Sequence, residues 1–159
     1  MARRGRAFLL EDKGLKEMAD RLSPQNRKKA LRIAMREGGS FVQKKVQTVY
    51  REAKPTSTLY NAIVLHLFPS GEGAVVRRAY IKGGSGKLFD KNSDLYRAYI
   101  LNFVEKGVGQ RETKKGYNRG GYKGIFFFRK GVNRARNTAI NKIRAVLLAA
   151  LEKQAKGNG

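Results

Sequence analysis

The spacing of apolar residues divides the chain into a helical start, a β-rich middle and a helical end. Within residues 11–21 the apolar positions recur at helical spacing and predict a short helix. A longer helix is predicted over residues 24–53. It begins at Ser23-Pro24, where serine can cap the helix and proline is pre-set for the first turn.

The long predicted helix has an internal weak point. Gly38-Gly39 interrupts its apolar stripe at a cost of about 1 kcal/mol per glycine relative to alanine. Ser40, followed by Gln43 three residues later, has the pattern of a capping box that restarts a helix. Residues 24–53 are therefore expected to form one kinked helix or two stacked helices.

The period then changes to that of strands. Residues 63–68 and 74–81 are apolar and β-branched, and the turn-forming residues between them complete a predicted β-hairpin. Residues 96–104 alternate and predict a third strand. Residues 107–124 hold six glycines and five basic residues, which is typical of a long mobile loop.

Helical spacing returns at Val132 and continues to about Lys153. The fold class predicted from this order is α+β. It consists of a long N-terminal helix, a three- to four-stranded antiparallel sheet, and a C-terminal amphipathic helix, with both helices packed on one face of the sheet. Residues 1–10 are expected to be a basic flexible arm, and residues 11–156 a single domain.

The net charge of the chain indicates the kind of partner that the protein contacts. The 159 residues include 35 Lys and Arg but only 12 Asp and Glu, so the formal net charge is +23. Such an excess costs stability through self-repulsion, and it is typical of proteins that meet a polyanion or an acidic surface. A solvated surface that merely favours lysine is the alternative. The basic residues of the Gly-rich loop, which are the candidates for contact with DNA or for assembly, are Arg111, Lys114, Lys115, Arg119 and Lys123.

Several kinds of chemistry are excluded by residue type. The chain has no cysteine, so thiol catalysis, disulfides and thiolate zinc sites are absent. No apolar run approaches the roughly 18 residues that a membrane span needs. The glycines before Lys87 suggest a phosphate-binding loop, but Leu88 stands where Ser or Thr is required. His66 is the only histidine and lies in an apolar strand. No catalytic residue, metal ligand or cofactor is therefore predicted.

A second hypothesis stays open beside this non-enzymatic one. The protein could be a basic nucleic-acid-binding protein, with a small ribonuclease as one form of it. Glu105, Arg111 and Tyr117 could then serve in catalysis, although their spacing does not single them out.

Three motifs in order resemble the head–tail joining or tail-completion proteins of long-tailed bacteriophages, the lambdoid neck type. A Pro-Thr turn with a following leucine precedes the first strand, as in residues 55–63. A tyrosine is followed by Glu-x-Gly at residues 99–107, and an aromatic Phe-Phe-Arg signature precedes the last helix. The resemblance covers residues 24–153. The residues that match the family motifs are Pro55, Thr56, Leu59, Tyr99, Glu105, Gly107, Phe127, Phe128 and Arg129.

The resemblance implies a non-enzymatic virion component at the neck or the head-proximal end of the tail, present in the host cytoplasm during assembly. Proteins of this kind form rings, often hexameric, that contact neighbouring neck and tail-tube proteins. A ring around the genome's exit path would use positive charge to contact double-stranded DNA without sequence preference. Phosphate contacts without base recognition would let the DNA slide.

Overall fold

The structure is a computed structural model, and it describes residues 8–9, 13–68, 73–78, 94–110, 112, 114, 116–118 and 120–157. The chain forms two compact units. The first unit comprises residues 1–45, 65–77 and 134–159, and the second comprises residues 46–64 and 78–133. The long helices contribute to both units, which are described separately below.

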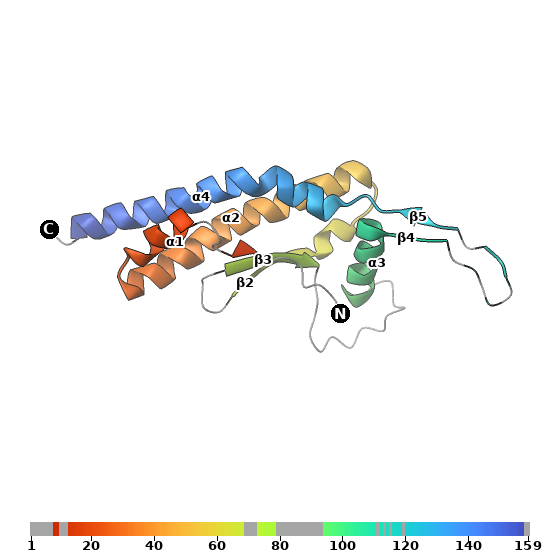
Figure 1. Cartoon of the computed structure of the whole chain (residues 1–159), viewed down its shortest axis with the longest axis horizontal. Helices are drawn as coiled ribbons and strands as arrows, with labels where there is room; N and C mark the ends of the chain where they lie inside the picture. Colours follow the sequence, from red (N-terminus) through yellow and green to blue (C-terminus); the bar gives the residue numbers. More distant parts are fainter. Residues whose placement is uncertain are drawn as a thin grey trace. The chain divides into compact units, whose positions relative to one another are not determined.

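The elements confirm an α+β protein that is mostly helical (Figure 1). The predicted short helix and the start and end of the long helix are also confirmed. No helix in the described parts of the chain is long and apolar enough to cross a membrane. In chain order the elements are β1 (Phe8–Leu9), α1 (Lys13–Asp20), α2 (Pro24–Ala53), the 3-10 helix η1 (Leu59–Ala62), β2 (Ile63–Leu67), β3 (Gly73–Arg78), α3 (Asp94–Lys106), β4 (Gly107–Val108), β5 (Tyr122–Lys123) and α4 (Phe127–Gly157).

Helix α2 is continuous, so of the two predicted alternatives a single helix agrees with the structure, and two stacked helices with a restart at Ser40 is wrong. The glycine pair that suggested a break is buried and serves close packing within the first unit. A Cβ atom on Gly38 would lie 2.6 Å from Cγ1 of Ile143, and one on Gly39 would lie 2.6 Å from Cδ1 of Leu65. The helix therefore tolerates the low helix propensity of two glycines because they let two neighbouring elements approach its backbone.

Helix α4 packs on α2, which corrects the prediction that both helices lie on the sheet. In the first unit Ile143 of α4 lies against Gly38 of α2, whereas Gly39 on α2 faces Leu65 and Ala74 of the sheet. Helix α2 is thus the middle layer, between α4 and the strands (Figure 1). An apolar stripe shows that a helix face is buried, but it does not show which element covers that face.

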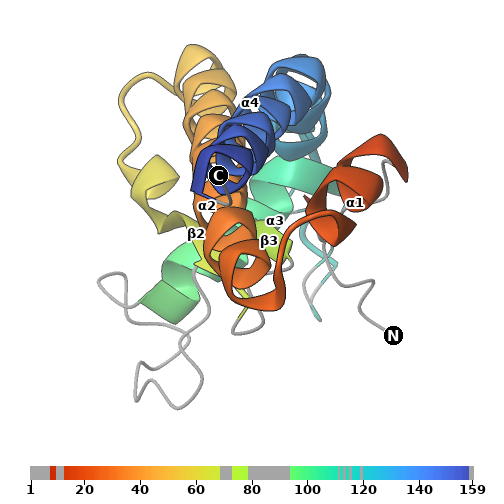
Figure 2. The same ribbon diagram turned by 90° about the vertical axis from the view of Figure 1, so that its left-hand side faces the viewer.

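The two helices run antiparallel, and α1 lies beside them (Figure 2). At one end of the pair, the backbone N–H of Ser23 donates to Oε1 of Gln154 over 2.9 Å. Further along α2, Gly38 lies against Ile143 of α4, which is earlier in α4 than Gln154. The two helices therefore run in opposite directions. The core of this unit joins all three helices with the sheet. It consists of Leu15, Ala19, Leu22, Ala30, Leu31, Ala34, Met35, Ala74, Ile143 and Leu147.

The sheet of the first unit has the strand order β1-β3-β2. The predicted hairpin is confirmed as β2 and β3, and the N–H of Phe68 donates to the carbonyl of Gly73 over 2.9 Å. Most of the predicted turn between them, residues 69–72, lies outside the described residues. The third strand is β1, which pairs with β3 in antiparallel register with Phe8 opposite Ala74.

The predicted third strand over residues 96–104 is wrong, because these residues belong to helix α3. Aromatic and aliphatic residues are so dense there that they fit both a period of two and a helical period. The helix brings Tyr99 and Phe103, four residues apart, into an edge-to-face contact with ring centroids 4.5 Å apart. It also buries Leu101 completely.

Helix α4 begins at Phe127 rather than at the predicted Val132, and it extends past Lys153 to Gly157. In the second unit Phe127 is buried against Tyr50 of α2, with ring centroids 4.9 Å apart and ring planes at 79°. One turn later, a Cβ on Gly131 would lie 2.6 Å from Cα of Val46. The first turns of α4 therefore approach the α2 backbone closely.

Candidate functional site

All nine residues that carry the family resemblance lie in the second unit. Those from α3, β4 and α4 meet where α3 ends, the β4–β5 ribbon begins and α4 starts. We call this meeting point the ribbon junction and define it by Glu105, Gly107, Gly124, Phe126 and Phe128. Segments about twenty residues apart in the sequence are joined there by hydrogen bonds and close backbone contacts.

The half-buried carboxylate of Glu105 caps helix α4. Its Oε2 accepts a hydrogen bond from the backbone N–H of Phe128 over 2.7 Å, and its Oε1 accepts one from Arg129 over 3.3 Å. Phe126, whose carbonyl accepts the first bond of the helix from Lys130 over 3.0 Å, has no side-chain acceptor of its own. Glu105 therefore supplies the missing cap, and its negative charge lies at the positive end of the helix dipole.

This cap explains why α4 begins five residues before the start predicted from its apolar pattern. A start signal is normally sought in the residues just before a helix, but this acceptor comes from 23 residues earlier in the chain. Two backbone bonds reinforce the contact. The N–H of Ile125 donates to the carbonyl of Val104 over 3.0 Å, and that of Phe126 donates to the carbonyl of Glu105 over 3.1 Å.

The base of the ribbon requires glycine on both strands. Gly107 has a φ of +79°, and a Cβ there would lie 2.4 Å from the backbone of Gly124 and of Tyr122. A Cβ on Gly124 would lie 2.4 Å from the carbonyl carbon of Lys106. Any side chain at either position would push the strands apart, so glycine is fixed there by space and at Gly107 also by conformation. Sequence analysis singled out Gly107 but missed Gly124.

Phe126 completes the junction with a strained backbone. Its φ of +51° is the one positive value among the described non-glycine residues, and its side chain is 45% exposed. A bulky residue in this region costs of order 1 kcal/mol or more, so the surrounding contacts must hold it there. This backbone conformation lets the chain pass from the end of β5 to the start of α4 within a few residues.

Residues 107–124 form a two-stranded ribbon at their base rather than the structureless loop that was predicted. Gly107 pairs with Lys123 and Val108 with Tyr122, and an isolated bridge joins Glu112 to Asn118 further out. An Asx turn follows, in which Oδ1 of Asn118 accepts from the N–H of Gly120 over 2.7 Å. The glycine content predicted a mobile loop, but glycine is also the residue that tight turns and bulges require. Composition alone therefore does not distinguish a mobile loop from a ribbon.

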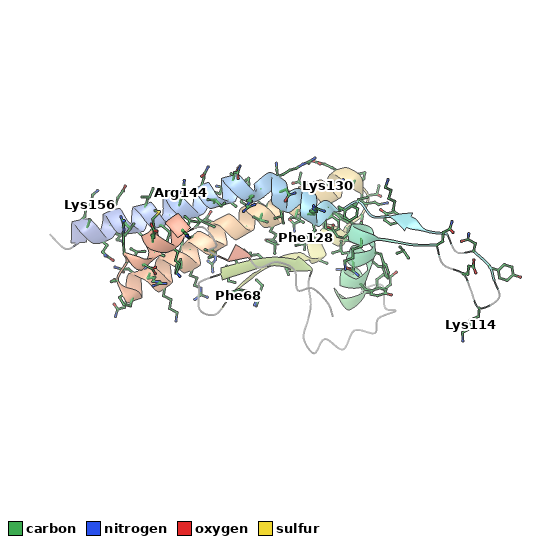
Figure 3. The ribbon with its side chains drawn as sticks, viewed as in Figure 1. Phe68, Lys114, Phe128, Lys130, Arg144 and Lys156 are labelled. Carbon is green, nitrogen blue, oxygen red and sulfur yellow. The ribbon has the colours of Figure 1, made fainter. Side chains whose placement is uncertain are left out.

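Of the five predicted DNA-facing residues, the structure describes two. Lys114 and Lys123 are both exposed on the ribbon, with Lys114 near its far end (Figure 3). Arg111, Lys115 and Arg119 lie outside the described residues. Two tyrosines of the ribbon are also exposed. Tyr117 is 70% exposed, and Tyr122, which is 37% exposed, has the Nζ of Lys54 at 5.1 Å from its ring centre.

The Pro-Thr motif lies in the turn after α2, and Leu59 begins η1. Ser57 organises this turn, because its Oγ lies 2.9 Å from the hydroxyl of Tyr50 and accepts from the N–H of Leu59 over 3.3 Å. Pro55 borders a depression of about 300 Å³ whose other walls are Thr48, Arg51 and Glu52. These contacts give the motif a structural role in joining α2 to the strand that follows.

Two members of the ribonuclease set have other surroundings than a shared site. Both oxygens of Glu105 already accept backbone hydrogen bonds, and Tyr117 is exposed on the ribbon. Arg111 lies outside the described residues. His66 is exposed on β2 and makes a ring contact with Phe68, with centroids 6.1 Å apart. Within the described residues, no three His, Asp or Glu side chains are grouped closely enough to hold a metal ion.

Comparisons with known proteins add no relative: no family model, curated protein or solved structure matches the chain.

Proposed function

We propose that the protein is a non-enzymatic structural subunit of a phage head–tail junction or tail-completion ring. The observation that carries this proposal is the ribbon junction. Motif residues that are scattered in the sequence are used there to fix one projecting ribbon, through the Glu105 cap and the contact between Gly107 and Gly124. A small protein that anchors an arm in this way is suited to joining copies of itself.

The ribbon has features of an assembly element. Its strands form a two-stranded sheet, so each is an edge strand, and edge strands are elements to which a neighbouring chain can add a strand. Exposed tyrosines such as Tyr117 and Tyr122 are among the residues that anchor protein interfaces. We infer that each ribbon docks on the next copy in a closed ring, for which we propose six subunits.

Charge sets the conditions for such a ring. Copies that each carry a net charge of +23 repel one another, so assembly requires screening salt, an acidic neighbour or DNA. The proposed setting would supply two of these, since neck and tail-tube proteins would surround the ring and double-stranded DNA would pass through it. The proposed location is the virion, with assembly in the host cytoplasm.

The experiment is a measurement of particle mass by light scattering after size-exclusion chromatography, at low and at high salt. A ring predicts a discrete multiple of the 17.8 kDa subunit that becomes more populated as salt rises. A single mass of one or two subunits under all conditions, with and without duplex DNA, would reject the ring.

Two ribbon variants show whether the ribbon makes the subunit contact. Tyr117→Ser with Tyr122→Ser removes the aromatic anchors and should reduce the assembled fraction. Lys114→Gln with Lys123→Gln is the matched control, because it changes two exposed residues of the same ribbon but keeps the tyrosines. The control should assemble at least as well as the wild type, since it lowers the repulsion between copies.

A further inference from the structure

A long stretch of the sequence that has many basic residues and no acidic residue begins in the ribbon and continues into helix α4. Between Glu112 and Glu152 the chain has no acidic residue, although ten lysines and arginines fall in that interval. The part of α4 within the first unit begins at Arg134, so much of this acid-free stretch lies on a regular helix whose other side is covered by α2.

Residues 136–144 carry three of these cations on the exposed part of the helix. The buried Ala139 and Ile143 face the core, and the exposed residues of this stretch are all polar. We call this surface the α4 polar face. It consists of Arg136, Asn137, Thr138, Asn141, Lys142 and Arg144.

Every charged group on the α4 polar face is a cation, and its neutral members are amides and a hydroxyl that can donate hydrogen bonds. The ammonium of Lys142 lies 5.7 Å from the ring centre of Phe41 on α2, which orients the side chain while leaving it exposed. Arg144 stands on the exposed side of the helix, as does Lys156 further along (Figure 3). The surface is therefore built to receive negative charge.

We propose that the α4 polar face binds the phosphate backbone of double-stranded DNA. The inference rests on the proposed function for its setting and deepens it by naming the surface and the partner. Phosphate oxygens in protein–DNA interfaces are contacted by cationic side chains and by hydrogen-bond donors. The α4 polar face has both, and it has no acidic residue that would repel a phosphate.

Other anions fit this surface less well. Single-stranded nucleic acid is held by aromatic side chains on which bases stack, and the exposed aromatic residues of the described chain, such as Tyr99 and Tyr117, lie in the second unit. The centre of a contact with an acidic protein partner is commonly anchored by tyrosine or tryptophan beside arginine. Along α4, the large apolar side chain that is exposed among the described residues is Leu148, which lies beyond this face.

The test compares two variants of equal charge. Arg136→Gln, Lys142→Gln and Arg144→Gln neutralise the α4 polar face, and Gln keeps a helix propensity close to that of Lys and Arg. The control neutralises three exposed cations on α2 of the same unit. It carries Lys28→Gln, Lys29→Gln and Arg32→Gln. Circular dichroism melting should show that both variants are folded.

The measurement is fluorescence anisotropy with a duplex of about 20 base pairs of arbitrary sequence, titrated between about 0.05 and 0.3 M salt. If all three cations contact phosphates, the plot of log affinity against log salt should be shallower by about 2.7 in the α4 variant. At about 0.1 M salt this corresponds to a loss of roughly 500-fold, whereas the control should lose much less.

Three results would overturn the proposal. The first is an equal loss in the control, which would mean that charge acts diffusely. The second is tighter binding of a single strand of the same length, and the third is displacement of the duplex by polyglutamate at equal charge. Particle mass is measured on the same samples. A wild type that never assembles would reject the ring. A shallower salt dependence of DNA binding in an α4 variant that still assembles would support the α4 surface and leave the ring intact.

Discussion

Replacing Glu105 with alanine should destabilise the protein through helix α4. The variant loses both acceptors for the backbone N–H groups of Phe128 and Arg129. Loss of an N-cap costs about 0.5–2 kcal/mol, and loss of a negative charge at a helix N-terminus costs about 0.3–1 kcal/mol. Because the carboxylate is half-buried and bonds two donors, we expect about 2 kcal/mol in total.

Thermal unfolding followed by circular dichroism measures this loss. For a chain of this length, about 2 kcal/mol corresponds to a fall in Tm of roughly 4–8 °C. Glu105→Gln keeps one acceptor oxygen and should lose about half as much. Glu112→Ala is the matched control, because it also removes one negative charge, but from an exposed residue of the ribbon.

The comparison is decisive because the two alanine variants have the same net charge. If both alanine variants melt within a degree of the wild type, the carboxylate does not hold the start of α4, and the junction is not the anchor of the ribbon. Equal but large losses in both would instead assign the effect to overall charge repulsion.

Four further outcomes follow from the structure. Ile143→Asp puts an unpaired charge into the α2–α4 layer and should cost about 3 kcal/mol or more, measured by thermal unfolding; a change in Tm of under one degree would contradict this packing. Gly38→Leu should also destabilise strongly, because its side chain would occupy the space of Ile143. Trypsin should cut the ribbon of the free subunit faster than that of the assembled protein, and equal cleavage would argue against ordering by assembly. Lys114→Glu, Lys115→Glu and Arg119→Glu together should fold normally and weaken binding equally for unrelated DNA sequences, whereas a hundredfold sequence preference in the wild type would contradict phosphate-type contact.

Helices α1 and α2 were predicted well because their signals are local, whereas α3 and the start of α4 were not. Ser23-Pro24 marks the start of α2 directly, and the N–H of Arg27 donates to the carbonyl of Ser23 over 2.8 Å as the cap pattern requires. Gly38-Gly39 misled for the opposite reason. The cost of glycine in a helix is local, whereas the benefit of contact with Ile143 depends on a residue about a hundred positions later.

The candidate site shows the same division. Glu105 and Gly107 were singled out by resemblance, but their roles as a helix cap and a point of close backbone approach became visible only when residues 124–129 were beside them. Residues 96–104 were assigned the wrong period because apolar residues fall on nearly every position, and tertiary packing decides such cases. A capping carboxylate from another element leaves no pattern in the sequence around the helix that it caps.

The division of the chain between the two units limits how this protein can change by recombination. The first unit is assembled from three separate stretches of sequence and the second from two, so exchanging one contiguous piece of the gene cannot transfer either unit intact. Residues 109–121 differ from the units in being one contiguous segment that can be exchanged alone, because the residues that flank it, Val108 and Tyr122, are paired with each other. This segment can be lengthened, shortened or replaced while both ends stay in register. We therefore expect natural variants to differ most there, and each to retain glycine at both positions where the ribbon begins.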